Sequence, residues 1–191
     1  MQYKPTAPLK IGLALTLSII SMTLLASPDI IIPSNTLERR TQAVQSGICG
    51  LSPEARELAA FIMQDKQQQR QQLHCNASLS IIAAAKAKEM AEQQLVTHFG
   101  QGGANRRLRN SGYPLAARYP SYFSNHVESV AGGNATAEEM WNVFSASTGH
   151  RRHLLGEHLF FRQQNEIGVG FAHAPGTEHE YYWVVYIAES D

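Results

Sequence analysis

The order of the periodic segments is the feature that most restricts what this chain can fold into. After Ser52, hydrophobic side chains recur at spacings of three and four, which is typical of helices packed against a core. Near the C-terminal end, Ile167, Val169 and Phe171 instead alternate with glycines. The segment 181–187 that follows is rich in β-prone residues. A run of helices followed by an antiparallel hairpin predicts an α+β domain.

Local signals place the elements that carry the candidate site. Ser52, followed by Pro53, is typical of a helix start, because the hydroxyl caps free backbone amides and proline suits the first turn. A second helix is predicted from about Ser78, and its apolar spacing continues to His98. We therefore expect His98 at the end of this helix, on the face turned toward the core. Residues 125–131 are predicted to form a strand.

The N-terminal segment has the pattern of a targeting signal. Lys4 and Lys10 precede an apolar run over residues 11–26. This pattern is typical of a signal peptide, and an uncleaved signal anchor is the alternative. In both cases the rest of the chain is expected outside the cytoplasm, secreted or periplasmic, and an anchor would also tether it to the membrane. We therefore predict a signal peptide or anchor at residues 1–26, a linker at residues 27–48 and one domain at residues 49–191.

The two cysteines, Cys49 and Cys75, leave two alternatives open. In an oxidising compartment they would pair and tie the segment before the first helix to the connection after it. In the other alternative they remain separate thiols. Cysteine number and spacing do not decide between the two.

The charge balance and the motif content exclude several classes of function. The chain holds 16 Lys and Arg against 16 Asp and Glu, so it lacks the basic excess of a nucleic-acid-binding protein. It contains no His-Glu-x-x-His motif, no Gly-x-Ser-x-Gly elbow and no phosphate-binding loop. A basic cluster at Arg106, Arg107 and Arg109 is interpreted either as a site for an anionic headgroup or wall polymer, or as a solvated helix face.

Five segments agree in order and spacing with one known family. They are AAAKAKEMAEQQLVTH at 83–98, RLRNSGY at 107–113, VESVAGG at 127–133, STGHRRHLL at 147–155 and EIGVGF at 166–171. Together they resemble the bacterial branch of the CAP superfamily, which includes cysteine-rich secretory, antigen-five and pathogenesis-related proteins. The resemblance implies an α-β-α sandwich, with a small antiparallel sheet between two helix layers. It also implies a cleft lined by histidines and glutamates.

The resemblance assigns three residues to that cleft. His98 takes the place of the family's first cleft histidine, and His150 takes the place of the second. Glu128 takes the place of the glutamate in the family's Glu-Asn-Ile-Ala motif. These three residues form the predicted site, and the remaining histidines are not assigned to it.

The chain also departs from the family pattern. The fourth cleft residue of the family is often a glutamate, and Ala146 holds its place here. Ser129 stands where the family usually has asparagine, and His153 stands where bacterial members often have asparagine. His153 is interpreted as a surface residue or as an additional ligand. The loss of the acid at Ala146 favours binding over catalysis.

Two imidazoles and one carboxylate are donors that suit zinc or another divalent cation. We predict His98 and His150 as metal ligands, and Glu128 as a ligand-binding residue or, in a hydrolase, as the catalytic base. His150 is expected near a helix start, where the dipole favours the neutral imidazole that binds metal. The alternative is a structural cluster of hydrogen bonds without a metal.

Three functions are compatible with this cleft. The first is a noncatalytic extracytoplasmic module that binds a ligand or a component of the cell envelope. The second is a metal-assisted hydrolase that acts on peptide or envelope material. The third is a lipid or sterol carrier with an apolar groove near residues 113–123. The sequence favours the binding module, because it shows no nucleophile and an incomplete set of acids.

Overall fold

The computed structural model describes residues 48–100, 102–119 and 124–191. The predicted leader and nearly all of the predicted linker lie outside these ranges. The helices and strands in chain order are α2 Pro53–Gln64, β1 His74–Cys75, α3 Ala77–Gln93, α4 Ala104–Asn110, β2 Glu128–Gly132, α5 Ala137–Ala146, α6 Thr148–Leu154, α7 Leu159–Arg162, β3 Glu166–His173 and β4 Tyr181–Ala188. None of the helices in the described ranges has the length and apolar character that a membrane crossing requires.

The strands form one four-stranded sheet in the order β1-β3-β4-β2. The predicted hairpin is confirmed: β3 and β4 pair antiparallel, from Glu166 opposite Ala188 to His173 opposite Tyr181. β2 pairs antiparallel with the other edge of β4. The two-residue strand β1 adds a parallel edge beside β3, which the sequence did not predict.

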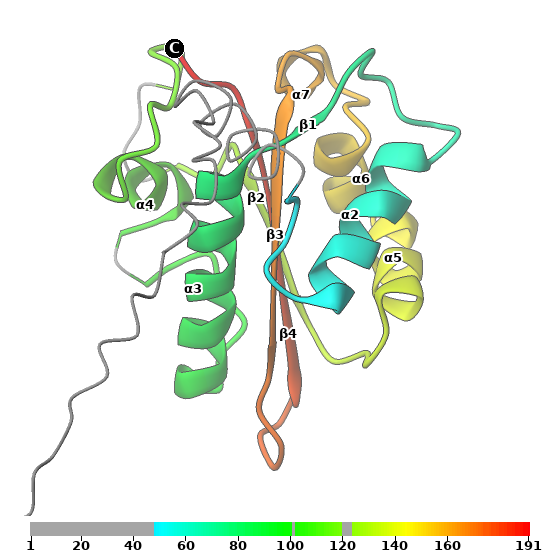
Figure 1. Cartoon of the computed structure of the whole chain (residues 1–191), viewed down its shortest axis with the longest axis vertical. Helices are drawn as coiled ribbons and strands as arrows, with labels where there is room; N and C mark the ends of the chain where they lie inside the picture. Colours follow the sequence, from blue (N-terminus) through cyan, green and yellow to red (C-terminus); the bar gives the residue numbers. More distant parts are fainter. Residues whose placement is uncertain (1–47, 101, 120–123) are drawn as a thin grey trace, which may run out of the picture. The chain divides into compact units, whose positions relative to one another are not determined.

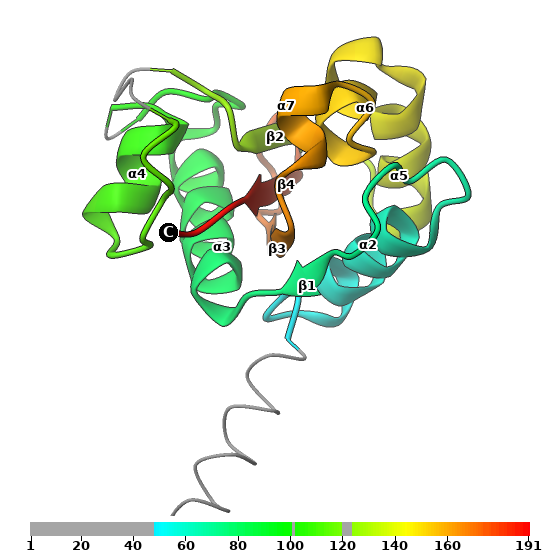
Figure 2. The same cartoon turned by 90° about the horizontal axis from the view of Figure 1, so that it is seen from above.

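Helices cover both faces of this sheet, as Figures 1 and 2 show. α3 and α4 lie on one face, and α2, α5 and α6 lie on the other. Successive side chains of a strand point to opposite faces, so β4 contributes to both hydrophobic cores. The core on the α3 side takes Tyr182, Val184 and Tyr186, and the core on the α2 side takes Trp183, Val185 and Ile187. The predicted α+β fold and its α-β-α layering are therefore confirmed.

Two glycines of β3 allow α3 to approach the sheet very closely. A Cβ atom built on Gly168 would lie 2.3 Å from the backbone carbon of Leu79. One built on Gly170 would lie 2.1 Å from the backbone carbon of Ala83. The absence of side chains at these glycines therefore allows the backbone of α3 to pack directly against β3. The close backbone approach that the sequence predicted at Gly168 is confirmed.

A disulfide joins Cys49 to Cys75, which settles the two alternatives that the sequence left open. Cys49 precedes α2 and Cys75 ends β1, so the bond ties the start of one helix layer to the edge of the sheet. The same segment is held by a backbone hydrogen bond of 2.7 Å from Val169 N to Cys49 O.

Candidate functional site

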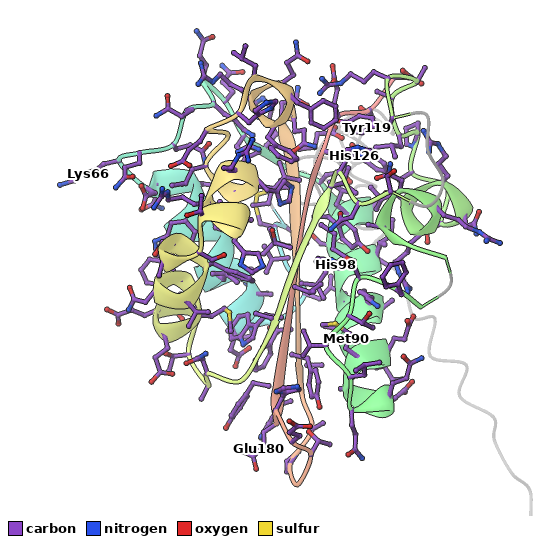
Figure 3. All side chains as sticks on the ribbon, turned by 180° about the vertical axis from the view of Figure 1, so that it is seen from behind. Lys66, Met90, His98, Tyr119, His126 and Glu180 are labelled. Atoms are coloured by element: carbon purple, nitrogen blue, oxygen red, sulfur yellow. A yellow bond between two sulfur atoms is a disulfide. The ribbon has the colours of Figure 1, made fainter. Side chains whose placement is uncertain are left out.

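A cavity of about 270 Å³ brings the three predicted residues together. Its wall is formed by His98, Asn125, His126, Glu128, Ser129, Ser147, Gly149, His150, His153 and Phe161. These residues come from the loop after α3, from β2 and the turn before it, and from α6 and α7. In Figure 3, His98 and His126 lie one above the other beside the sheet.

His98 reaches the cavity from a loop, so the prediction that it ends a helix is wrong. α3 ends at Gln93, and Gln94 takes a left-handed conformation with φ 53°. Leu95 N then donates to Met90 O at 3.0 Å, which closes the helix with the bond pattern of a left-handed cap. The chain turns away from the helix axis at this point, and the predicted core residue Leu95 is exposed.

Glu128 orients the ring of His98. The Nδ1 atom of His98 lies 2.9 Å from Oε1 of Glu128, whose side chain is fully buried. The hydroxyl of Tyr186 donates to the other carboxylate oxygen, Oε2, at 2.5 Å. Both oxygens of Glu128 are therefore engaged, and the nitrogen of His98 that remains for a ligand is Nε2.

The pairing of β2 with β4 explains why this carboxylate is buried beside a phenol. Glu128 and Tyr186 are directly opposite each other in the sheet. Burial, and then the neighbouring Glu128 carboxylate, raise the pKa of Tyr186 well above its ordinary value. The phenol therefore keeps its proton at neutral pH and remains a hydrogen-bond donor to Glu128.

Asn125 fixes the backbone at the start of β2. Its Oδ1 accepts from Glu128 N at 2.9 Å, and its Nδ2 donates to Glu128 O at 2.9 Å. Both backbone groups of Glu128 are thus taken by one side chain. This local turn is the reason that the strand begins at Glu128 and not at the predicted position 125.

His150 lies in the first turn of α6, as predicted. Its ring packs edge-on against Phe144, with 4.8 Å between the ring centres. Burial lowers the pKa of His150, the nearby His98 lowers it further, and a backbone hydrogen bond at Val130 opposes the shift. The imidazole is therefore neutral at neutral pH, and burial is the main reason for it. Its Nδ1 is buried and has no hydrogen-bond partner within the described part of the chain.

His153 is buried, so its interpretation as a surface residue is wrong. The hydroxyl of Ser129 lies 2.8 Å from its Nδ1, and its Nε2 lies 3.4 Å from Ile187 O. The carbonyl fixes a proton on Nε2, so Nδ1 accepts from the serine hydroxyl. The two positions that depart from the family's asparagines are thus partners of each other in the cavity wall.

We expect His153 to make the fold sensitive to acid. Burial lowers the pKa of His153 from 6.5 to about 3. Between these values the unfolded chain binds a proton that the folded protein excludes, so stability is complete above pH 6.5 and decreases as the pH falls. The expected loss between pH 7 and pH 5 is about 2 kcal/mol.

Urea unfolding at pH 7 and pH 5 measures this loss. His153→Asn should shrink the pH-dependent loss by about 2 kcal/mol, whatever its effect on stability at pH 7. His74→Asn, at an exposed position, should leave it unchanged. An unaltered pH dependence in His153→Asn would contradict the assignment of acid sensitivity to this residue.

His126 is a wall residue that no sequence pattern singled out. Asn105 Nδ2 donates to its Nδ1 at 3.0 Å, and Gln164 Nε2 donates to its backbone carbonyl at 2.6 Å. Burial lowers its pKa, so it adds another neutral imidazole to the wall. Neither partner is close in the sequence, and no local signal marks the pairing.

The predicted basic cluster does not form a solvated face. Arg107 is buried on α4 and forms an ion pair with Glu89 of α3, in which its Nη2 donates to both carboxylate oxygens, at 2.9 and 2.7 Å. Arg109 donates to the backbone carbonyl of Tyr119. Arg106 is the member of the cluster whose side chain is exposed. Two of these arginines therefore serve packing, and the cluster does not present three cations to an anionic ligand.

The cavity wall contains the two predicted metal ligands, His98 and His150, and the predicted ligand-binding residue Glu128. Within the described ranges, no group of three or more His, Cys, Asp and Glu side chains is arranged to hold a metal ion. Glu128 is the carboxylate among the wall residues, and it faces His98 and Tyr186. Ala146, in the place of the family's fourth acid, is exposed at the end of α5. His98 and His150 remain as two imidazole nitrogen donors, which suits a divalent cation completed by water or by a ligand.

Comparisons with known proteins support the fold alone. No family model matches the chain, and no curated protein matches it. Among solved structures, an outer surface protein from Borrelia burgdorferi is similar, with a TM-score of 0.52 over 70% of this chain and 90% of that chain. The two sequences are 17% identical. The likeness shows a shared α+β architecture and carries no residue roles from one chain to the other.

Proposed function

We propose that this chain is an extracytoplasmic binding module of the CAP type, in which His98 and His150 hold a divalent cation such as zinc. The cation and the cavity around it would engage a component of the cell envelope. The order of the five motifs and the α-β-α layers support the family. The observation that carries the metal is the His98 Nδ1 to Glu128 hydrogen bond of 2.9 Å.

This hydrogen bond has the arrangement found around histidines that ligate metals. A carboxylate that accepts from one ring nitrogen fixes the tautomer and directs the other nitrogen outward. Glu128 does this for His98, and Tyr186 holds Glu128 in turn. His150 supplies a neutral imidazole in the same wall. In this proposal Glu128 acts through His98 and does not bind the ion.

Three observations support a location outside the cytoplasm. The N-terminal residues 1–26 have the pattern of a leader or an anchor. The disulfide between Cys49 and Cys75 suits an oxidising compartment. The structural neighbour carries the name of an outer surface protein. We therefore propose a secreted or periplasmic protein, with residues 11–26 as a tether if the leader is retained.

The site favours binding over hydrolysis. A metal-assisted hydrolase needs a base within reach of a metal-bound water. Both oxygens of Glu128 are already engaged, and no second carboxylate is among the described wall residues. The lipid-carrier alternative has no support in the described part of the segment 113–123, where Tyr113, Leu115, Ala116 and Tyr119 are buried in the core.

Calorimetric titration with zinc tests the proposal. The protein should bind one zinc ion, and His98→Ala combined with His150→Ala should abolish binding. Glu128→Gln should weaken binding by about 10-fold to 100-fold, because the amide supports the His98 tautomer less well. His74→Ala, at an exposed position outside the cavity wall, is the matched control. Zinc binding that survives the double substitution would refute the proposed site.

A further inference from the structure

A second buried charge lies beneath the loop that carries His98. Lys86 is on α3, and its side chain is fully buried. Its Nζ donates to the backbone carbonyl of Phe99 at 2.7 Å and pairs with Oε1 of Glu89 at 3.4 Å. A buried ammonium is costly unless it is paired and hydrogen-bonded, so this contact is a specific one.

Apart from the contacts of His98 with Glu128 and Asn125, the loop above Lys86 has little apolar anchorage. Leu95 and Phe99 are exposed, at 54% and 70%, so apolar burial does little to fix the segment between them. Val96 is the residue of this loop that packs against the core. The carbonyl held by Lys86 belongs to Phe99, the residue directly after His98. Lys86 therefore fixes the path of the backbone next to the Cα atom of His98.

Gly100 shows how closely the loop fits over this charge. Its φ is +105°, and a Cβ built on it would lie 2.1 Å from Oε1 of Glu89 and 3.4 Å from Nζ of Lys86. The backbone therefore passes directly over the Lys86–Glu89 pair. Arg107 also holds Glu89, because its Nη2 donates to both carboxylate oxygens, so the pair is itself fixed.

The carboxylate partner of His98 also affects the charge of Lys86. Burial lowers the pKa of Lys86, and the charges of Glu128 and Glu89 oppose this shift. The negative charges of these two carboxylates therefore favour the protonated ammonium of Lys86. Lys86 therefore contacts the backbone beside His98, and Glu128, the partner of His98, contributes to the electrostatics around its ammonium.

We propose that Lys86 is the positioning residue of the site: its buried ammonium holds the Phe99 carbonyl and thereby directs the His98 ring toward Glu128 and the cavity. The zinc readout of this role rests on the proposed function. The orientation of His98 does not, because it is a property of the metal-free protein. Lys86 is not among the residues of the cavity wall, so it acts through His98.

Lys86→Met tests this role, because it removes the charge and keeps an apolar stem of similar length. Lys88→Met is the matched control, since Lys88 lies on the same helix, 75% exposed, in an ion pair with Glu92. The first readout is the imidazole N–H proton that His98 donates to Glu128, followed by NMR in the metal-free protein. Lys86→Met should lose or displace this signal, and Lys88→Met should retain it.

The second readout is zinc affinity. Lys86→Met should bind zinc about 10-fold more weakly while remaining folded at 25 °C by circular dichroism. A wild-type N–H signal together with wild-type zinc affinity in folded Lys86→Met would overturn the inference. If the wild-type protein binds no zinc, the proposed function fails, and the N–H signal alone decides the role of Lys86.

Gly100→Ala keeps the test open if Lys86→Met does not fold. Its new methyl group would collide with the Glu89 carboxylate and push the loop away from the Lys86–Glu89 pair, while Lys86 keeps its charge. It should perturb the His98 N–H signal and weaken zinc binding as Lys86→Met does. A folded Gly100→Ala protein with an unchanged His98 signal and unchanged zinc affinity would show that the loop path does not set the ring position.

Discussion

Alanine at position 170 should destabilise the protein by about 3 kcal/mol or more, because the new methyl group would meet main-chain atoms that cannot rotate away. Its Cβ would lie 2.1 Å from both the carbonyl carbon and the carbonyl oxygen of Ala83 in α3. Either α3 must move off the sheet or β3 must bend. Both changes disturb the core on the α3 side, which includes the chain that leads into the His98 loop.

Equilibrium unfolding in urea gives the magnitude. Gly149→Ala is the control, since its nearest neighbour would be Ser147 Oγ at 4.0 Å, and its stability should stay within about 1 kcal/mol of the wild type. Equal stability of Gly170→Ala and Gly149→Ala would contradict the close packing of α3 on β3.

Removal of the disulfide should cost about 3.5 kcal/mol of stability, on the loop-entropy account of cross-links. Cys49 and Cys75 are 26 residues apart, and the loop they close contains the whole of α2. Without the bond, the unfolded chain gains conformational freedom that the folded state does not share. The Cys49→Ser plus Cys75→Ser protein should therefore unfold at a lower urea concentration than the oxidised wild type.

A reducing agent provides the internal control for this prediction. It should lower the stability of the wild type to about that of the double-serine protein, and it should leave the double-serine protein unchanged. If the double-serine protein is as stable as the oxidised wild type, then the disulfide contributes nothing to the fold.

The sequence predicted elements whose signals are local. Ser52 caps α2, with Pro53 in its first turn, and the glycine alternation in β3 marks the close approach of α3. The end of α3 was missed for a local reason as well. Gln94 adopts φ 53° without being glycine, and the apolar spacing continues across it, so nothing in the pattern marks the stop.

The parts of the site that the sequence missed depend on contacts between distant segments. Ser129 and His153 are 24 positions apart, and they meet because α6 packs against β2. In the sequence, Arg107 is one of three neighbouring arginines that are compatible with a surface cluster. In the structure it pairs with Glu89, which is 18 positions away. Periodicity gives the face on which a residue lies, but it does not give the partner on the facing element.

The position of β4 in the middle of the sheet has a consequence for how the protein is made. β2 pairs with β4, and the hairpin partner of β3 is also β4. A chain emerging from the ribosome therefore has no completed sheet until residues 181–188 are free. Until then β2 lacks the strand with which it pairs, and both hydrophobic cores lack the side chains that β4 supplies. We therefore expect folding to be completed only after residues 181–188 have left the ribosome.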